Sequence, residues 1–274
     1  MRILLCCILL SLVSPAALAA VPPHKIKADY LSSEIDFRED GISLDKNGKP
    51  VTGLVKAENP HVFFAYIPFV DGKREGVARS YRHVIEEGVY YLYEEVPFVG
   101  GRHEGVLKNY DSRGNLLREL SYAAGEENGL QKLYHENGRL RAQTVFREGK
   151  RQGPEQRWDK QGRLIWEGTY SDDHVEGMVK RYEDGVLYSE TPFVKDKEQG
   201  TAKLYDEKGR LEREVPYVNG LIEGTMRVYD EQGRLKTETP WVANERHGVE
   251  KTYDANGRVM QRITYVDGLA RHAE

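Results

Sequence analysis

Glycine recurs at a nearly constant interval through most of the chain, and this period constrains the fold more than any other feature. Successive marker glycines are separated by 29, 24, 24, 24, 23, 24 and 24 residues. An aromatic residue stands five positions after each of them, and a second stands seven positions before. A fixed period in this range is typical of a repeat array, in which binding is a commoner role than catalysis. The marker glycines are Gly76, Gly105, Gly129, Gly153, Gly177, Gly200, Gly224 and Gly248.

The first residues of the chain have the three parts of an export signal. They are Arg2, an apolar run from Ile3 to Val13, and the small residues Ala17 and Ala19 before Ala20. This pattern predicts a cleaved secretory signal over residues 1–19, and the apolar run is too short to span a bilayer. Both cysteines lie inside it, so we expect no disulfide in the exported chain. We predict a periplasmic protein of a Gram-negative bacterium.

The formal net charge of the chain is −4, which makes it mildly acidic. A net basic field, which would collect phosphate groups, is therefore missing, and we do not expect nucleic acid as a partner.

Each repeat has the residue pattern of a β-hairpin. In the repeat that starts at Gly224, Thr225–Tyr229 and Leu235–Trp241 are predicted strands. Asp230–Gly233 between them has the chemistry of a type I turn followed by a bulge. The dipeptide Asn219-Gly220 marks the second turn, which leads from one hairpin to the next.

Strand alternation predicts which side chains share a face. With Asp230 paired to Arg234, positions 225, 227, 229, 235, 237, 239 and 241 are expected on one packing face. That face would carry the aromatics together with a basic column. The opposite, solvated face would carry a glutamate column. The basic column is Arg79, Lys108, Lys132, Lys180, Lys203, Arg227 and Lys251, with Gln156 as its exception; the glutamates are Glu119, Glu167, Glu190, Glu214 and Glu238.

The basic column has two interpretations. Long basic stems can cover aromatic rings while their charges stay in water. Alternatively, the column forms a basic and aromatic groove for an acidic partner.

Together these patterns predict an all-β fold, in which tandem β-hairpin repeats form a curled, elongated, single antiparallel meander sheet. Residues 20–60 repeat poorly and are predicted to form an N-terminal cap, and residues 61–274 the repeat array. Prolines 68, 97, 192, 216 and 240 precede the second aromatic, so pairing should locally end there. The longest step places an insertion within residues 82–95, either a binding loop or simply a longer hairpin.

Two of the repeats contain the strings Tyr-Asp-Glu-Gln-Gly-Arg-Leu from Tyr229 and Tyr-Asp-Glu-Lys-Gly-Arg-Leu from Tyr205, each of which is followed by Pro and a second aromatic. Through these strings the repeat resembles the MORN-repeat variant of the YwqK antitoxin family. The resemblance covers about Pro68 to Gly268. It implies an antitoxin or immunity role, and MORN repeats elsewhere are linked to protein and membrane-lipid contact. The export signal departs from the cytoplasmic antitoxin pattern and favours an immunity protein against a toxin delivered to the periplasm. The family implies no catalytic residues.

The sequence contains no recognisable catalytic or metal-binding motif. The histidines are scattered, and no nucleophile elbow, phosphate loop or zinc motif is present. The carboxylates recur with the period, as folding residues should, and no constellation clearly interrupts it. We expect no enzyme activity, no catalytic residues, no cofactor and no metal.

The predicted function is therefore direct binding of a cognate effector toxin. The alternative is a cell-envelope scaffold, or a protein that contacts lipid headgroups through the basic and aromatic face. Binding proteins usually contact partners through exposed aromatic and arginine side chains. The predicted partner-binding residues are Tyr90, Tyr91, Tyr93, Arg102, His103, Arg246 and His247.

Overall fold

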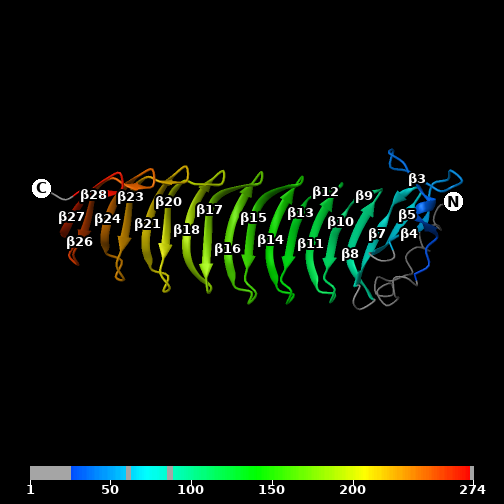
Figure 1. The fold of residues 1–274 in the computed structure, drawn as a ribbon, viewed down its shortest axis with the longest axis horizontal. Helices are drawn as coiled ribbons and strands as arrows, with labels where there is room; N and C mark the ends of the chain where they lie inside the picture. Colours follow the sequence, from blue (N-terminus) through cyan, green and yellow to red (C-terminus); the bar gives the residue numbers. More distant parts are fainter. Residues whose placement is uncertain (1–25, 60–62, 85–88, 272–274) are drawn as a thin grey trace, which may run out of the picture. The chain divides into compact units, whose positions relative to one another are not determined.

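The structure is a computed structural model that describes residues 26–59, 63–84 and 89–271. The predicted export signal at residues 1–19 lies outside the described residues. The chain divides into two compact units, residues 1–138 and residues 139–274. In both units consecutive strands follow one another as an antiparallel meander (Figure 1), so the predicted all-β hairpin fold is confirmed. Within the described ranges, no helix is long and apolar enough to cross a bilayer.

The first unit begins with a short irregular region and continues as hairpins. Strand β1 pairs with β4 in parallel, Tyr30 opposite Val55, which is a departure from the predicted antiparallel order. Strands β2 and β3 pair separately, after the 3-10 turn η2 (Ser32–Glu34). The strands are β1 (Tyr30–Leu31), β2 (Asp36–Phe37), β3 (Ser43–Leu44), β4 (Gly53–Asn59), β5 (Phe63–Val70), β6 (Lys73–Arg74), β7 (Gly76–Val84), β8 (Val89–Val99), β9 (Arg102–His103), β10 (Gly105–Tyr110), β11 (Leu116–Ala123), β12 (Glu126–Glu127) and β13 (Gly129–Tyr134).

The second unit consists of hairpins throughout its described residues. Its strands are β14 (Leu140–Arg147), β15 (Lys150–Trp158), β16 (Leu164–Ser171), β17 (His174–Glu183), β18 (Val186–Val194), β19 (Lys197–Glu198), β20 (Gly200–Tyr205), β21 (Leu211–Val218), β22 (Leu221–Ile222), β23 (Gly224–Tyr229), β24 (Leu235–Val242), β25 (Glu245–Arg246), β26 (Gly248–Tyr253), β27 (Val259–Val266) and β28 (Leu269–Arg271).

Both predicted turns of the repeat are present. At the first turn, the Asp230 carboxylate accepts hydrogen bonds from the backbone N–H groups of Gln232 and Arg234, each at 2.9 Å. Gly233 has a φ of 76°, which a residue with a side chain rarely adopts. At the second turn, Asn219 and Gly220 both have positive φ, as a two-residue hairpin turn requires.

The proline column marks a break in pairing, as predicted. Pro240 lies in β24, and its carbonyl oxygen accepts the N–H of His247 at 3.0 Å. His247 lies between β25 and β26, so the strand opposite Pro240 is interrupted at this point. Trp241 pairs with Arg246 whereas Glu238 pairs with Lys251, so the interruption adds two residues to the opposite strand and leaves the faces unchanged.

The predicted assignment of side chains to faces is wrong after the first turn. In the observed register Arg227 pairs with Glu238 and Val228 with Thr237, whereas Tyr229 pairs with Leu235. Lys236 is therefore the extra residue of a bulge. Because side chains alternate with a period of two, one extra residue moves the rest of the return strand to the other face.

The two faces of the sheet have different chemistry. The ladder face carries the first tyrosine, the basic column and the glutamate column, for example Tyr229, Arg227 and Glu238. The aromatic face carries the second aromatic and the residues that alternate with the basic column. Most of the buried residues of the repeats lie on the aromatic face, among them Ala78, Val96, Phe98, Leu107, Tyr170, Val179, Thr191, Phe193, Ala202, Val215 and Thr239.

A ladder of polar contacts joins consecutive hairpins on the ladder face. Six tyrosine hydroxyls each donate to the glutamate 15 residues earlier in the chain, at 2.7 to 2.9 Å. The basic column pairs with the same glutamates, as in Arg79–Glu95 at 2.9 Å and Arg227–Glu238 at 3.3 Å. The exception Gln156 is matched by Gln143, whose amide donates to it at 2.8 Å.

The ladder begins after the first two hairpins. The residue 15 positions before Tyr81 is Tyr66 rather than a glutamate, and the buried Tyr81 hydroxyl has no partner among the described residues. Phe64, Tyr66 and Tyr81 instead form an apolar cluster that Ile26 and Ala28 help to cover. A second cluster of Ile35, Val51, Val55 and Phe69 lies on the aromatic face. The cap assigned to residues 20–60 stays a prediction.

The ladder makes stability sensitive to high pH. Burial and then the hydrogen bond to Glu190 raise the pKa of Tyr205 to about 12. An unfolded tyrosine has a pKa of about 10. The folded state therefore holds the Tyr205 proton more tightly than the unfolded state does. The resulting contribution to the free energy of unfolding is complete below pH about 10 and is lost as the pH rises through about 12. Tyr134, Tyr182 and Tyr229 behave in the same way.

We expect Tyr205→Phe to lose stability less steeply between pH 10 and 12 than the parent chain, because one shifted proton is removed. Urea unfolding at a series of pH values measures this. Tyr188→Phe, which removes an exposed hydroxyl outside the ladder, is the control. An identical decline in the parent chain and in Tyr205→Phe would contradict the role of the ladder.

Candidate functional site: interruptions of the repeat

The predicted contact residues of the first unit lie on two faces. Tyr90 stacks between His83 and Phe64, with ring centroids 4.6 Å from each. Tyr91 is paired across the hairpin with Arg82 on the opposite face. The guanidinium of Arg82 lies 3.5 Å from the ring centre of Tyr93. The insertion is thus a longer β7–β8 hairpin, and residues 85–88 at its end lie outside the described residues.

The other predicted contact residues lie near second turns. Arg102 is exposed in β9, whereas His103 packs edge-on against Phe98 at 4.7 Å. Arg246 lies over the rings of both Trp241 and Tyr265, and its Nη1 donates to the Tyr265 hydroxyl at 3.1 Å. His247 pairs with Asp267 at 3.4 Å. The role of these seven residues in binding stays a prediction.

Arginines normally connect neighbouring first turns. Arg163 donates through Nη1 to the Asp184 carboxylate of the next turn at 2.8 Å. Arg210 likewise donates to the backbone carbonyl of Glu231 at 3.0 Å and to its carboxylate at 3.4 Å. Each bridge uses the arginine that immediately precedes the aliphatic residue of the return strand.

The bridge is absent at two places among the described residues of the second unit: Arg234 contacts only Asp230 and Gln232 of its own turn, and the turn at Asp184 has no arginine. The repeat with the 23-residue step closes its first turn with two residues, Asp184 and Gly185, and Glu183 pairs directly with Val186. Val186 therefore occupies the position of the bridging arginine. Glu207, the equivalent of Glu231 in the next turn, has no hydrogen-bond or ion-pair partner among the described residues.

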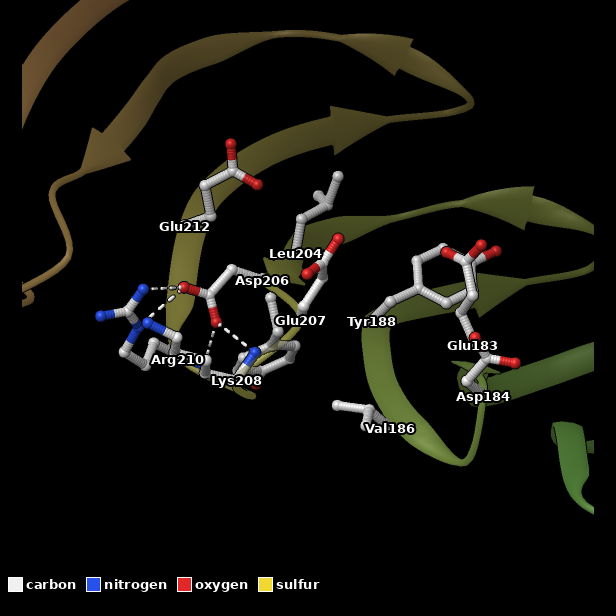
Figure 2. A pocket seen from close by; sticks show the side chains of 11 residues that line it. Glu183, Asp184, Val186, Tyr188, Leu204, Asp206, Glu207, Lys208, Arg210 and Glu212 are labelled. Carbon is white, nitrogen blue, oxygen red and sulfur yellow. Dashed lines mark hydrogen bonds and ion pairs between the residues drawn. The ribbon is translucent and has the colours of Figure 1, made fainter.

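The missing bridge leaves a hollow between the two turns. Its volume is about 820 Å³, and it is lined by the β17–β18 hairpin on one side and the β20–β21 hairpin on the other (Figure 2). We call it the tip hollow, and its defining residues are Glu183, Val186, Tyr188, Leu204, Glu207 and Glu212.

The charges around the tip hollow are mostly negative. Arg210 is held by Asp206 at 2.6 Å and by the next turn, so it does not neutralise Glu207. The side-chain hydrogen bond from Arg210, followed by its backbone N–H, lowers the pKa of Asp206. Glu183 and Glu212 have no ion-pair partner in the described part of the chain. The hollow can therefore accept a basic side chain against Tyr188 and Val186.

A second interruption lies on the aromatic face of β15 and β16. The side chain of Glu155 is only 7% exposed and accepts hydrogen bonds from Arg157 Nε at 2.5 Å and from the Thr144 hydroxyl at 3.0 Å. The Arg157 guanidinium lies 4.5 Å from the centre of the Trp166 ring. The threonine contact recurs in a later repeat, where Thr239 donates to Glu250 at 2.8 Å, whereas the contacts of Arg157 with Glu155 and Trp166 have no equivalent in the other described repeats.

Gly168 makes room for the Trp166 indole. A Cβ atom at Gly168 would lie 2.7 Å from Trp166 Cη2 and 3.2 Å from a Val179 methyl. The corresponding positions in later repeats are Thr191, Val215 and Thr239. The signal in the sequence was thus a glycine where other repeats have a side chain, together with a tryptophan two residues earlier.

Among the residues that the structure describes, no group of three or more His, Cys, Asp or Glu side chains could hold a metal ion.

Comparison with known proteins identifies the repeat. The family model described as "MORN repeat variant" matches residues 127–148, 198–219 and 246–267, each of which covers one hairpin. No curated protein matches the chain. The chain is thus a repeat protein with MORN-variant repeats, and arrays of this kind serve binding.

Two solved structures show a weak likeness. One is the crystal structure of TcdB2-TccC3-Cdc42, with 13% identity, a TM-score of 0.18, and coverage of 82% of this chain. The chain spans only 16% of the length of that protein. The other is a protein of unknown function from Bacteroides fragilis, with 7% identity, a TM-score of 0.11, and coverage of 74% of this chain and 91% of the other.

We expect Gly168→Ala to displace the Trp166 indole and to destabilise the chain by about 1–3 kcal/mol, because the added methyl group overlaps the ring. Near-ultraviolet circular dichroism should show the altered tryptophan environment, and urea unfolding the loss of stability. Thr191→Ala, at the same position of the next repeat, should leave the tryptophan signal unchanged. An unchanged signal in Gly168→Ala would contradict the packing described here.

Proposed function

We propose that the chain is a periplasmic protein-binding repeat protein whose partner is a secreted effector toxin. It neutralises the toxin by direct binding, as an immunity protein, and performs no catalysis itself. The export pattern at residues 1–19 and the resemblance to antitoxin repeats support the location and the role.

The tip hollow is the observation that carries the binding proposal. Neighbouring turns show how a guanidinium is held there, because Arg210 binds both the carbonyl and the carboxylate of Glu231. Glu207 offers the equivalent carboxylate, but Val186 supplies no guanidinium. A basic side chain of the partner can take the place of the missing arginine and form a charge-assisted hydrogen bond.

The structure gives less support to lipid-headgroup binding. That alternative used the basic column as a free positive surface. The basic residues instead lie beside the glutamate column, as in Lys180, which is 3.8 Å from both Glu167 and Glu190. Pairing of this kind reduces the attraction to an anionic membrane.

The partner can be identified by capturing proteins on the tagged mature chain in periplasm and culture medium, followed by mass spectrometry. We expect one secreted enzyme in stoichiometric amount, and the purified chain should inhibit that enzyme at an equimolar ratio. Recovery of envelope proteins or lipid alone, or capture without inhibition, would overturn the immunity role.

Val186→Arg tests the tip hollow directly. The new arginine should bridge to Glu207 and close the hollow, so we expect binding of the captured enzyme to weaken at least tenfold while stability is kept. Titration calorimetry measures the affinity, and urea unfolding the stability. Lys236→Arg, at an exposed bulge of a later hairpin, is the control. Full affinity in a folded Val186→Arg variant would place the contact elsewhere.

A further inference from the structure

The Arg157–Trp166 pair begins a row of arginines across the aromatic face. Cross-strand pairing places Trp166 opposite both Arg157 and Arg181. The same register continues from Arg181 through Ser189 and Leu204 to Arg213. Side chains that are paired directly across an antiparallel sheet lie on one face. We call these residues the arginine row: Arg157, Trp166, Arg181, Ser189, Leu204 and Arg213.

The guanidinium of Arg157 is fixed in orientation. Its Nε donates to the buried Glu155, its plane lies over Trp166, and its Nη2 is 3.5 Å from the Tyr170 hydroxyl. The side chain is nevertheless 44% exposed. An arginine held in this way loses little side-chain entropy when it binds a carboxylate through its remaining N–H groups.

The other two arginines lack an acidic partner. Neither Arg181 nor Arg213 forms an ion pair within the described part of the chain, and the buried Nε of Arg213 has no hydrogen-bond partner there. Most arginines at the first turns, by contrast, are held by an aspartate, as Arg210 is by Asp206. The arginine row therefore has unused donors, in contrast to the basic column of the ladder face, most of whose residues pair with glutamates.

We propose that the arginine row binds an extended acidic segment of a partner protein, with carboxylates seated on Arg157, Arg181 and Arg213. Arg157 and Arg181 lie two strands apart, or about 10 Å, and Arg213 lies about 14 Å further along the row. An extended chain advances about 3.3 Å per residue. Because alternate side chains of an extended segment point to the same side, the spacing must be even, and four residues, or about 13 Å, is the even spacing nearest to both distances. The segment therefore carries acidic side chains about four residues apart.

The arginine row and the tip hollow adjoin, because Leu204 belongs to both. Glu183 and Glu212 in the hollow repel a continuation of the acidic segment and favour a basic residue there. The proposal thus deepens the protein-binding function by naming the charge pattern of the partner. Its three arginines do not line the tip hollow, and its test does not require the toxin.

The test uses the full chain and a fluorescein-labelled Gly/Ser peptide with glutamates at positions 2, 6 and 10, which share one side of an extended chain. Fluorescence anisotropy should show saturable binding that weakens as salt rises. The same peptide with glutamines in place of the glutamates should not bind. Arg181→Gln should weaken binding roughly tenfold, which corresponds to the loss of one charge-assisted hydrogen bond. Lys203→Gln removes the same charge from the ladder face and should leave binding unchanged.

Arg157→Gln alone leaves the buried Glu155 without its cation and can impair folding. The double variant Glu155→Gln, Arg157→Gln avoids this and should also weaken binding roughly tenfold. Three results would overturn the proposal. Arg181→Gln could bind the peptide as tightly as the parent chain does, or Lys203→Gln could lose as much peptide affinity as Arg181→Gln. The chain could also bind anionic vesicles but not the peptide. Loss of peptide binding in Arg181→Gln with retained binding by Val186→Arg would separate the two surfaces.

Discussion

A one-residue bulge near the first turn of hairpins such as β20–β21, β23–β24 and β26–β27 determines which side chains share a face. The outgoing strand and the return strand differ by one residue, Lys236 in the repeat that starts at Gly224. That residue brings Glu238 beside Arg227 and within reach of the next tyrosine, Tyr253, whose hydroxyl donates to it at 2.7 Å. The same bulge moves Trp241 to the opposite face. Contacts between hairpins on the ladder face depend on this register, because an unbulged return strand would point the glutamate away from its donors.

The elements of the fold could be predicted from the sequence, because the turns have local causes. Asn219-Gly220 and Asp230–Gly233 require positive φ at fixed positions, and the strands between them follow. The faces could not be predicted by alternation alone, because the bulge lies between two otherwise regular segments. Placing it requires the register, in which Val228 pairs with Thr237 and Tyr229 with Leu235.

The candidate site could be predicted only in part. The 23-residue step and Val186 are visible in the sequence. That they leave Glu207 without a bridging arginine could be seen only in the structure, which shows what the arginines of other turns contact. Gln156 was visible as an exception, and the structure shows that Gln143 compensates for it. The contact between Trp166 and Gly168 depends on packing across β16 and β17, which no spacing rule describes. Of the aromatics and arginines predicted as contacts, Tyr90 is half-buried against other rings, whereas Arg246 is exposed and lies over Trp241 and Tyr265.

The ladder continues without interruption past the tip hollow. Tyr182 donates to Glu167 at 2.7 Å, and Tyr205 donates to Glu190 at 2.8 Å, on either side of the shortened turn. The hairpins at the hollow are thus joined on the ladder face as firmly as any others, and the lost arginine bridge concerns only exposed turn residues. Exposed ion pairs contribute little to stability, typically under about 1 kcal/mol. An array held by its ladder can therefore lose one bridge at small cost. Departures from a local pattern without a structural gain are expected where a protein binds its partner.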